Sequence, residues 1–130
     1  MVHEKHKIPV YSNTLNLVYD DKCEIHEMIE KLEIEDEGID DILENSESST
    51  GYTFCANGEY WICYHKNFNH GVIAHEIKHY LNFIYAQLDC KLSLEEDEHE
   101  AYFLGYITDL AYKFIKENKI KRQCCRIMLL

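Results

Sequence analysis

Hydrophobic and polar positions along the chain predict strands and a short helix first, then a hairpin and two longer helices. Residues 7–21, KIPVYSNTLNLVYDD, are rich in β-branched and aromatic side chains, which predicts one or two strands with SNT as a turn. Residues 21–34 place apolar side chains on one helical face and predict a short helix, with Asp20 or Asp21 as its N-cap. The polar stretch 35–50 predicts a loop.

The segment 51–65, GYTFCANGEYWICYH, predicts a β-hairpin. Asn57-Gly58 is a preferred dipeptide for a type I′ turn, which requires positive φ at both central positions. A two-residue turn fixes the register, so that alternate side chains share one face: Tyr52, Phe54, Trp61 and Cys63. Cys55 then lies on the other face, which argues against a disulfide with Cys63. We expect the strand 59–65 to offer its edge to an extended peptide.

Two helices are predicted after the hairpin. Asn69 can cap a helix from about Gly71 to Gln87. Ser93 begins a capping box, SLEE, and predicts a second helix that runs to about Asn118. Apolar residues occupy most of the circumference of this second helix, so we expect it to be central. The pattern predicts a single α+β domain over residues 1–130, built from a small antiparallel sheet whose hairpin precedes two helices.

The charge of the chain disfavours nucleic acid as a partner. The net charge is −11, and residues 20–47 alone contain 13 acidic side chains against two lysines. An acidic protein repels phosphate backbones, so we expect no nucleic-acid binding. One alternative follows from the same segment: an acidic mimic of DNA that acts as an inhibitor. The tail 119–130 is basic and then apolar.

Localisation follows from the apolar runs and the cysteines. No run is long enough to span a membrane, and the first ten residues are too polar for a signal peptide. The six cysteines include no CxxC pair, and without a signal peptide we expect them to be reduced. These features predict a cytoplasmic protein without a membrane partner, and they leave its oligomeric state open.

The stretch GVIAHEIKHYLNF, residues 71–83, contains the pattern HExxH. Residues four apart stand on one helical face, so His75 and His79 can offer two imidazole nitrogens to one zinc ion. Glu76 lies next to the first histidine and can act as general base on a water molecule. The pattern is short, and the competing interpretation is an amphipathic helix that happens to carry two histidines.

A catalytic zinc site needs a third protein ligand, and three carboxylates follow the motif at a suitable distance. These candidates are Asp97, Glu98 and Glu100. Glu98 and Glu100 lie about 200° apart on a helical wheel, so only one of them can be the ligand. Helical geometry alone does not choose between them.

The order of strands, hairpin, VIAHEIKH, a short turn and DEHEAYFLGYITD resembles the zinc metallopeptidases of the gluzincin type. It resembles most the small ones encoded by bacteriophages, related to those that cleave phage repressors. In that group the glutamate three residues before the alanine of an AY pair is the ligand. The resemblance therefore implies that Glu98 is the third ligand, and Ala101, Tyr102 and Gly105 match the rest of the motif. It covers about residues 50–118 and implies a minimal zincin-like fold.

Two features depart from this group. Thermolysin-like gluzincins place an aspartate four residues after the ligand glutamate, where this chain has Tyr102. No further histidine is placed to stabilise an oxyanion, so a tyrosine hydroxyl is the expected donor. Tyr102 is our first candidate, beside Tyr80 and Tyr106.

Three hypotheses follow. The first is an enzyme: a phage-encoded zinc metallopeptidase with one zinc ion per chain, acting on a protein or peptide in the host cytoplasm. The second is a non-catalytic zinc-binding protein on the same scaffold, which serves in the virion or in host takeover. The third is the acidic DNA mimic. The presence of Glu76 favours the first, because a purely structural metal site needs no base.

Overall fold

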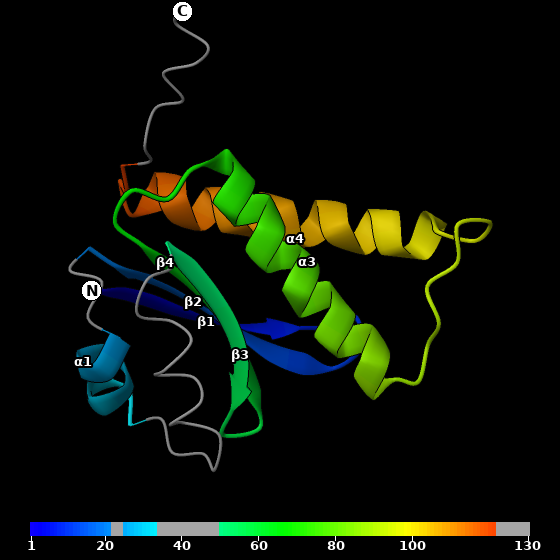
Figure 1. Ribbon diagram of the computed structural model, residues 1–130, viewed down its shortest axis with the longest axis horizontal. Helices are drawn as coiled ribbons and strands as arrows, with labels where there is room; N and C mark the ends of the chain where they lie inside the picture. Colours follow the sequence, from blue (N-terminus) through cyan, green and yellow to red (C-terminus); the bar gives the residue numbers. More distant parts are fainter. Residues whose placement is uncertain (22–24, 34–49, 122–130) are drawn as a thin grey trace, which may run out of the picture.

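The computed structural model describes residues 1–21, 25–33 and 50–121 (Figure 1). They form an α+β fold with four strands in one sheet and three helices. The elements are β1 (Val2–Ile8), β2 (Asn13–Asp20), α1 (Ile25–Lys31), β3 (Gly51–Ala56), β4 (Glu59–His65), α3 (His70–Gln87) and α4 (Glu98–Glu117). In Figure 1, α3 and α4 cover one face of the sheet, and α1 lies on the other side. The predicted loop 35–50, except Thr50, and most of the tail 119–130 lie outside the described residues.

The sheet is mixed, with the strand order β1-β2-β4-β3. The hairpins β1–β2 and β3–β4 are antiparallel, and the two central strands β2 and β4 run parallel to each other. The prediction of an antiparallel sheet is therefore wrong at its centre. The physical reason is that β2 and β4 belong to different hairpins, joined by a long connection that allows parallel pairing.

This strand order also corrects the predicted role of β4. β4 pairs with β2 on one side and with β3 on the other, so neither of its edges is free to accept a peptide. Among the described strands, β3 and β1 are the outer ones. The outer strand of this hairpin is therefore β3, whereas the sequence pattern predicted that the edge of β4 would be open.

The β3–β4 hairpin confirms the predicted turn. Asn57 and Gly58 have φ values of 55° and 71°, and Ala56 pairs with Glu59. On the face away from α3, the rings of Phe54 and Trp61 stack with their centroids 5.9 Å apart. The local dipeptide signal was sufficient because the turn depends on the φ preference of these two residues alone.

Two apolar clusters lie on the two faces of the sheet. The larger one lies between the sheet and the helices α3 and α4, and it includes Leu17, Ile62, Ile77, Phe103 and Ile107. The smaller one lies on the other face and includes Val18, Ile29 of α1, Phe54, Trp61 and Cys63. Because both faces are covered, the central strand β4 is buried continuously from Tyr60 to His65, as expected for a strand with neighbours on both sides.

The first residues of the helices differ in how well local signals predicted them. The Asn69 side chain caps α3 and accepts a hydrogen bond from the Val72 backbone N–H at 3.0 Å, as predicted. Asp20 is instead the last residue of β2. The prediction that Asp20 caps the helix is therefore wrong, whereas the prediction for Asp21 depends on residues 22–24, which lie outside the described residues.

α4 begins at Glu98 rather than after Ser93. The Ser93 hydroxyl accepts a hydrogen bond from the Glu95 N–H at 3.2 Å, which forms a local turn in place of a cap. The helix is also not central, because it contacts the rest of the fold along one side only. Tyr102 on its outer side is 76% exposed, whereas Phe103 is buried.

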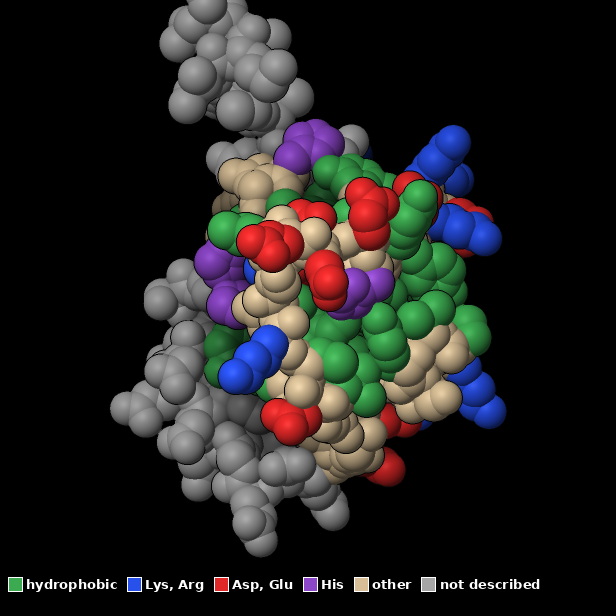
Figure 2. Space-filling view, turned by 90° about the vertical axis from the view of Figure 1, so that its right-hand side faces the viewer, with side chains coloured by type: hydrophobic (Ala, Val, Ile, Leu, Met, Phe, Trp, Pro, Cys, Tyr) green, Lys and Arg blue, Asp and Glu red, His purple; other side chains and the backbone are tan. Residues whose placement is uncertain are grey.

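Hydrophobic side chains gather with acidic ones on the face that carries the end of α3 and the beginning of α4 (Figure 2). Exposed apolar residues of this region include Leu88, Leu92 and Leu94. None of the described helices has an apolar stretch long enough to cross a membrane.

Two glycines allow a paired test of the fold. Gly58 has a positive φ of 71°, so Gly58→Ala should destabilise the hairpin by about 1 kcal/mol. Gly105 lies in the exposed side of α4, where an added Cβ meets nothing within 4 Å. Gly105→Ala should therefore stabilise the protein by about 0.5–1 kcal/mol. Urea unfolding measures both, and a loss of stability in the Gly105 variant would contradict this description of α4.

His65 predicts a pH dependence of stability. His65 is 1% exposed, and burial lowers the pKa of its imidazole, an effect that Asp20 partly offsets. The unfolded chain takes up a proton at His65 near the ordinary pKa of about 6.5, whereas the folded chain does so only at lower pH. The free energy of unfolding should therefore fall as the pH drops from about 6.5 toward the folded pKa.

His65→Gln should reduce this slope, measured by urea unfolding between pH 7.5 and pH 5, and the exposed His99→Gln should leave it unchanged. Identical slopes in wild type and in the His65 variant would show that His65 is not held neutral in the folded state.

Candidate functional site

The HExxH residues lie near the middle of α3 (His70–Gln87). The helix buries Ile73, Ile77 and Ile84 against the sheet, which turns His75 and His79 outward. Their Nε2 atoms are 3.0 Å apart, and the ring centroids are 4.6 Å apart. The structure therefore brings the two predicted histidine ligands together with their outer nitrogens converging.

This arrangement fits two positions of a zinc site. Two nitrogens bound to one tetrahedral zinc ion at about 2.0–2.1 Å lie about 3.3 Å from each other. The observed Nε2–Nε2 separation of 3.0 Å between His75 and His79 is close to that value. It also suits an N–H···N hydrogen bond between two neutral imidazoles, the form in which histidine binds a metal.

Glu76 is buried, with 6% of its surface exposed. Its Oε1 accepts a hydrogen bond of 2.8 Å from the Thr53 hydroxyl of β3, and the same hydroxyl lies 3.1 Å from the Glu76 backbone oxygen. The carboxylate therefore lies between α3 and the outer strand β3, next to the histidine pair. A carboxylate in this position can accept a proton from a molecule bound beside it.

Two neighbouring grooves meet at these residues. One has a volume of about 480 Å³ and extends toward the beginning of α3, where Asn69 and Gly71 line it. The other has a volume of about 370 Å³ and extends along β3 toward Phe83. Both are lined by Gly51, by His75 and by Glu76. The predicted base therefore lies where an elongated ligand along β3 would pass.

The structure does not bring the predicted third ligand to the histidines. Glu98 is the exposed first residue of α4, opposite on the helical wheel to the buried Ile107. Glu100 lies on the side that faces α3, but its Oε1 forms an ion pair of 2.5 Å with Lys78. Among residues 1–21, 25–33 and 50–121, no group of three His, Cys, Asp or Glu side chains could hold a metal ion.

The three tyrosines considered as oxyanion donors differ in their surroundings. The Tyr80 hydroxyl is buried and donates to Asn13 Oδ1 at 2.6 Å, and burial raises the pKa of Tyr80. Tyr102 and Tyr106 lie on the exposed side of α4. The hydroxyl of Tyr80 is therefore already engaged by Asn13, and Tyr102 and Tyr106 are open to solvent.

Sequence reasoning missed three residues around Glu76, all in the hairpin. They are Gly51, Thr53 and Tyr64. Burial raises the pKa of Tyr64, and the nearby Glu76 carboxylate raises it further, so the hydroxyl keeps its proton. The pairing of Gly51 with Tyr64 could be read from the Asn57-Gly58 register. The packing of this part of the hairpin against α3 could not be predicted from the sequence, because it is a contact between distant segments.

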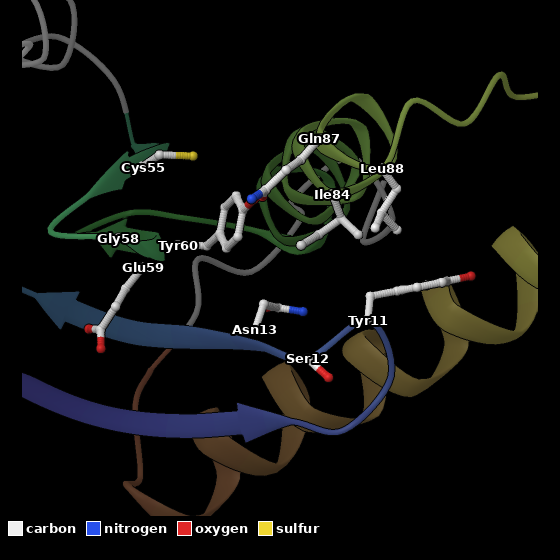
Figure 3. A pocket seen from close by; sticks show the side chains of 10 residues that line it. All are labelled: Tyr11, Ser12, Asn13, Cys55, Gly58, Glu59, Tyr60, Ile84, Gln87 and Leu88. Atoms are coloured by element: carbon white, nitrogen blue, oxygen red, sulfur yellow. The ribbon is translucent and has the colours of Figure 1, made fainter.

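A separate cavity of about 460 Å³ lies between the two hairpin turns and the end of α3 (Figure 3). Tyr60 and Gln87 point toward each other in it, and the Tyr60 hydroxyl donates to the Gln87 side-chain oxygen. The cavity includes no residue of the HExxH motif, so it belongs to a different part of the surface.

No protein-family model, no curated protein and no solved structure matches this chain. Any assignment of function therefore depends on the geometry of His75, Glu76 and His79 and on the sequence pattern around them.

Gly51 should be sensitive to substitution. A Cβ at this position would lie 2.6 Å from Val72 Cγ1 and 3.0 Å from Glu76 Cγ, so the side chain of Val72 or α3 itself would have to shift. Gly51→Ala should therefore cost about 1–3 kcal/mol in urea unfolding. Val72→Ala removes the closer contact, so the double variant should be less destabilised than the sum of the two single variants. Additive effects would show that Gly51 and Val72 are not in contact.

Proposed function

We propose that this protein is a metal-dependent peptidase in which His75 and His79 bind a divalent ion and Glu76 is the general base. The observation that supports the proposal best is the 3.0 Å separation of the two Nε2 atoms in a groove that the buried Glu76 also lines. A zinc ion bound there would supply Lewis acidity for the hydrolysis of a peptide bond. Zinc is the metal that the pattern HExxH favours.

The roles of the protein's own groups follow from their positions. Glu76 would accept the proton of the attacking water and later pass it to the leaving amine. The outer strand β3 would hold an extended substrate by adding it to the sheet, beside the two grooves that meet at Glu76. These groups suit a protein or peptide as substrate.

For the third metal ligand, two carboxylates are proposed. The resemblance to gluzincins implies Glu98, and Glu100 is the alternative, which would have to leave its ion pair with Lys78. Following the same resemblance, we propose a phage origin and a place of action in the host cytoplasm.

A second candidate function is a zinc-binding interaction protein without catalysis, acting in the virion or in host takeover. Among the described residues no three possible ligands lie together, so this candidate too needs further ligands for its metal. The third hypothesis, acidic DNA mimicry, concerns residues 20–47, most of which lie outside the described part.

Metal content is the first test. Protein purified without chelator or nickel should contain about one zinc per chain by elemental mass spectrometry. His75→Ala should lose the metal, because it removes one of the proposed ligands, and the matched control His99→Ala should retain it. Glu98→Gln and Glu100→Gln identify the third ligand, because only the variant that removes a ligand should lose zinc. A wild type that contains no metal, even after zinc is added, would overturn the proposal.

Catalysis is tested on a mixture of internally quenched fluorogenic peptides. Glu76→Gln should keep the zinc and lower the hydrolysis rate by about 10²–10⁴-fold, because it removes only the base. The matched control Glu95→Gln, in an exposed turn, should leave the rate unchanged. If the wild type binds zinc but does not cleave peptides or casein, the second candidate function is favoured over the peptidase.

A further inference from the structure

Thr53 of β3 forms a hydrogen bond with the side chain of the proposed base. The hairpin register pairs Thr53 with Ile62, which places its side chain on the face toward α3. Thr53 is 8% exposed and Glu76 is 6% exposed, so their contact is shielded from water. A buried carboxylate is stable only when donors replace the water that it has lost.

The hydrogen bond from Thr53 fixes one oxygen of this carboxylate. A hydroxyl group carries a single proton, and the contact to Glu76 Oε1 at 2.8 Å is shorter than the contact to the backbone oxygen at 3.1 Å. Oε1 is therefore the principal acceptor. Hydrogen bonds to a charged acceptor are the stronger kind, so this bond can select one rotamer of the Glu76 side chain.

The second oxygen, Oε2, lies on the side of Gly51. A Cβ on Gly51 would lie 3.3 Å from it, and Gly51 and Glu76 together line both grooves. Within the described ranges, no residue donates a hydrogen bond to Oε2 of Glu76. One oxygen is thus held against β3, and the other is left for a ligand.

We infer that Thr53 is a positioning residue for Glu76 and that it couples the base to the strand that receives the substrate. The inference deepens the proposed function and rests on it. Thr53 acts through Glu76 and does not itself touch a reacting atom. Because the hydroxyl belongs to β3, any substrate that pairs with β3 is aligned by the same strand that orients the base.

Three variants separate this role from a merely structural one. Thr53→Val keeps the shape of the side chain but removes the hydroxyl, and Thr53→Ser keeps the hydroxyl but removes the methyl group. Thr14→Val is the matched control, because Thr14 is a half-buried threonine on β2 that pairs with Lys7, in the other hairpin. A structural role alone would lower the melting temperature without changing the rate constant well below that temperature.

The first readout is the position of the Glu76 carboxylate in crystal structures of the variants. It should leave the wild-type position in Thr53→Val and keep it in Thr53→Ser and in Thr14→Val. A carboxylate that stays in place in Thr53→Val would overturn the inference, whether or not the protein is an enzyme.

The second readout is hydrolysis of the fluorogenic peptide mixture together with zinc content. Thr53→Val should keep about one zinc per chain and lower kcat by about 10- to 100-fold with little change in KM, and Thr53→Ser should restore most of kcat. A wild-type rate in Thr53→Val would overturn the inference and leave the peptidase intact. Absence of zinc and of hydrolysis in the wild type would overturn the peptidase, and the carboxylate position would still decide the role of Thr53.

Discussion

The close approach of α3 to the outer strand β3 is the constraint on which the site depends. It is possible because Gly51 has no side chain where Val72 and Glu76 need the space. This approach buries Glu76 and brings it within hydrogen-bonding distance of Thr53. It also fixes how α3 is rotated, and therefore which way His75 and His79 point.

The parts of the fold that depend on local preferences could be predicted from the sequence. The turn at Asn57-Gly58 and the cap at Asn69 require only the φ preference or the side chain of one or two residues. The convergence of His75 and His79 follows from the helical repeat, because residues four apart share a face.

The remaining features depend on contacts between distant segments, which no local pattern specifies. The parallel pairing of β2 with β4 makes β3 an outer strand. The sequence of β2 or β4 alone does not indicate which strand it pairs with. The capping box at Ser93 is a sound local signal, but the chain uses that hydroxyl in a turn, and α4 begins at Glu98. The place of Glu98 relative to the histidines depends on how α4 packs on α3, and this could not be derived from its spacing.

The parallel central pair has a consequence for the order in which the chain folds. Leu15 pairs with Tyr60, so β2 and β4 meet only after a long stretch of chain has been closed into a loop, at a considerable cost in entropy. Each hairpin has a short connection and can form within microseconds, whereas the central pairing must wait for both. We expect the two hairpins to form early and independently, and their joining to be the slow step. Until then the apolar strand β4 has an unpaired edge, and at high concentration this intermediate is the species most prone to aggregate.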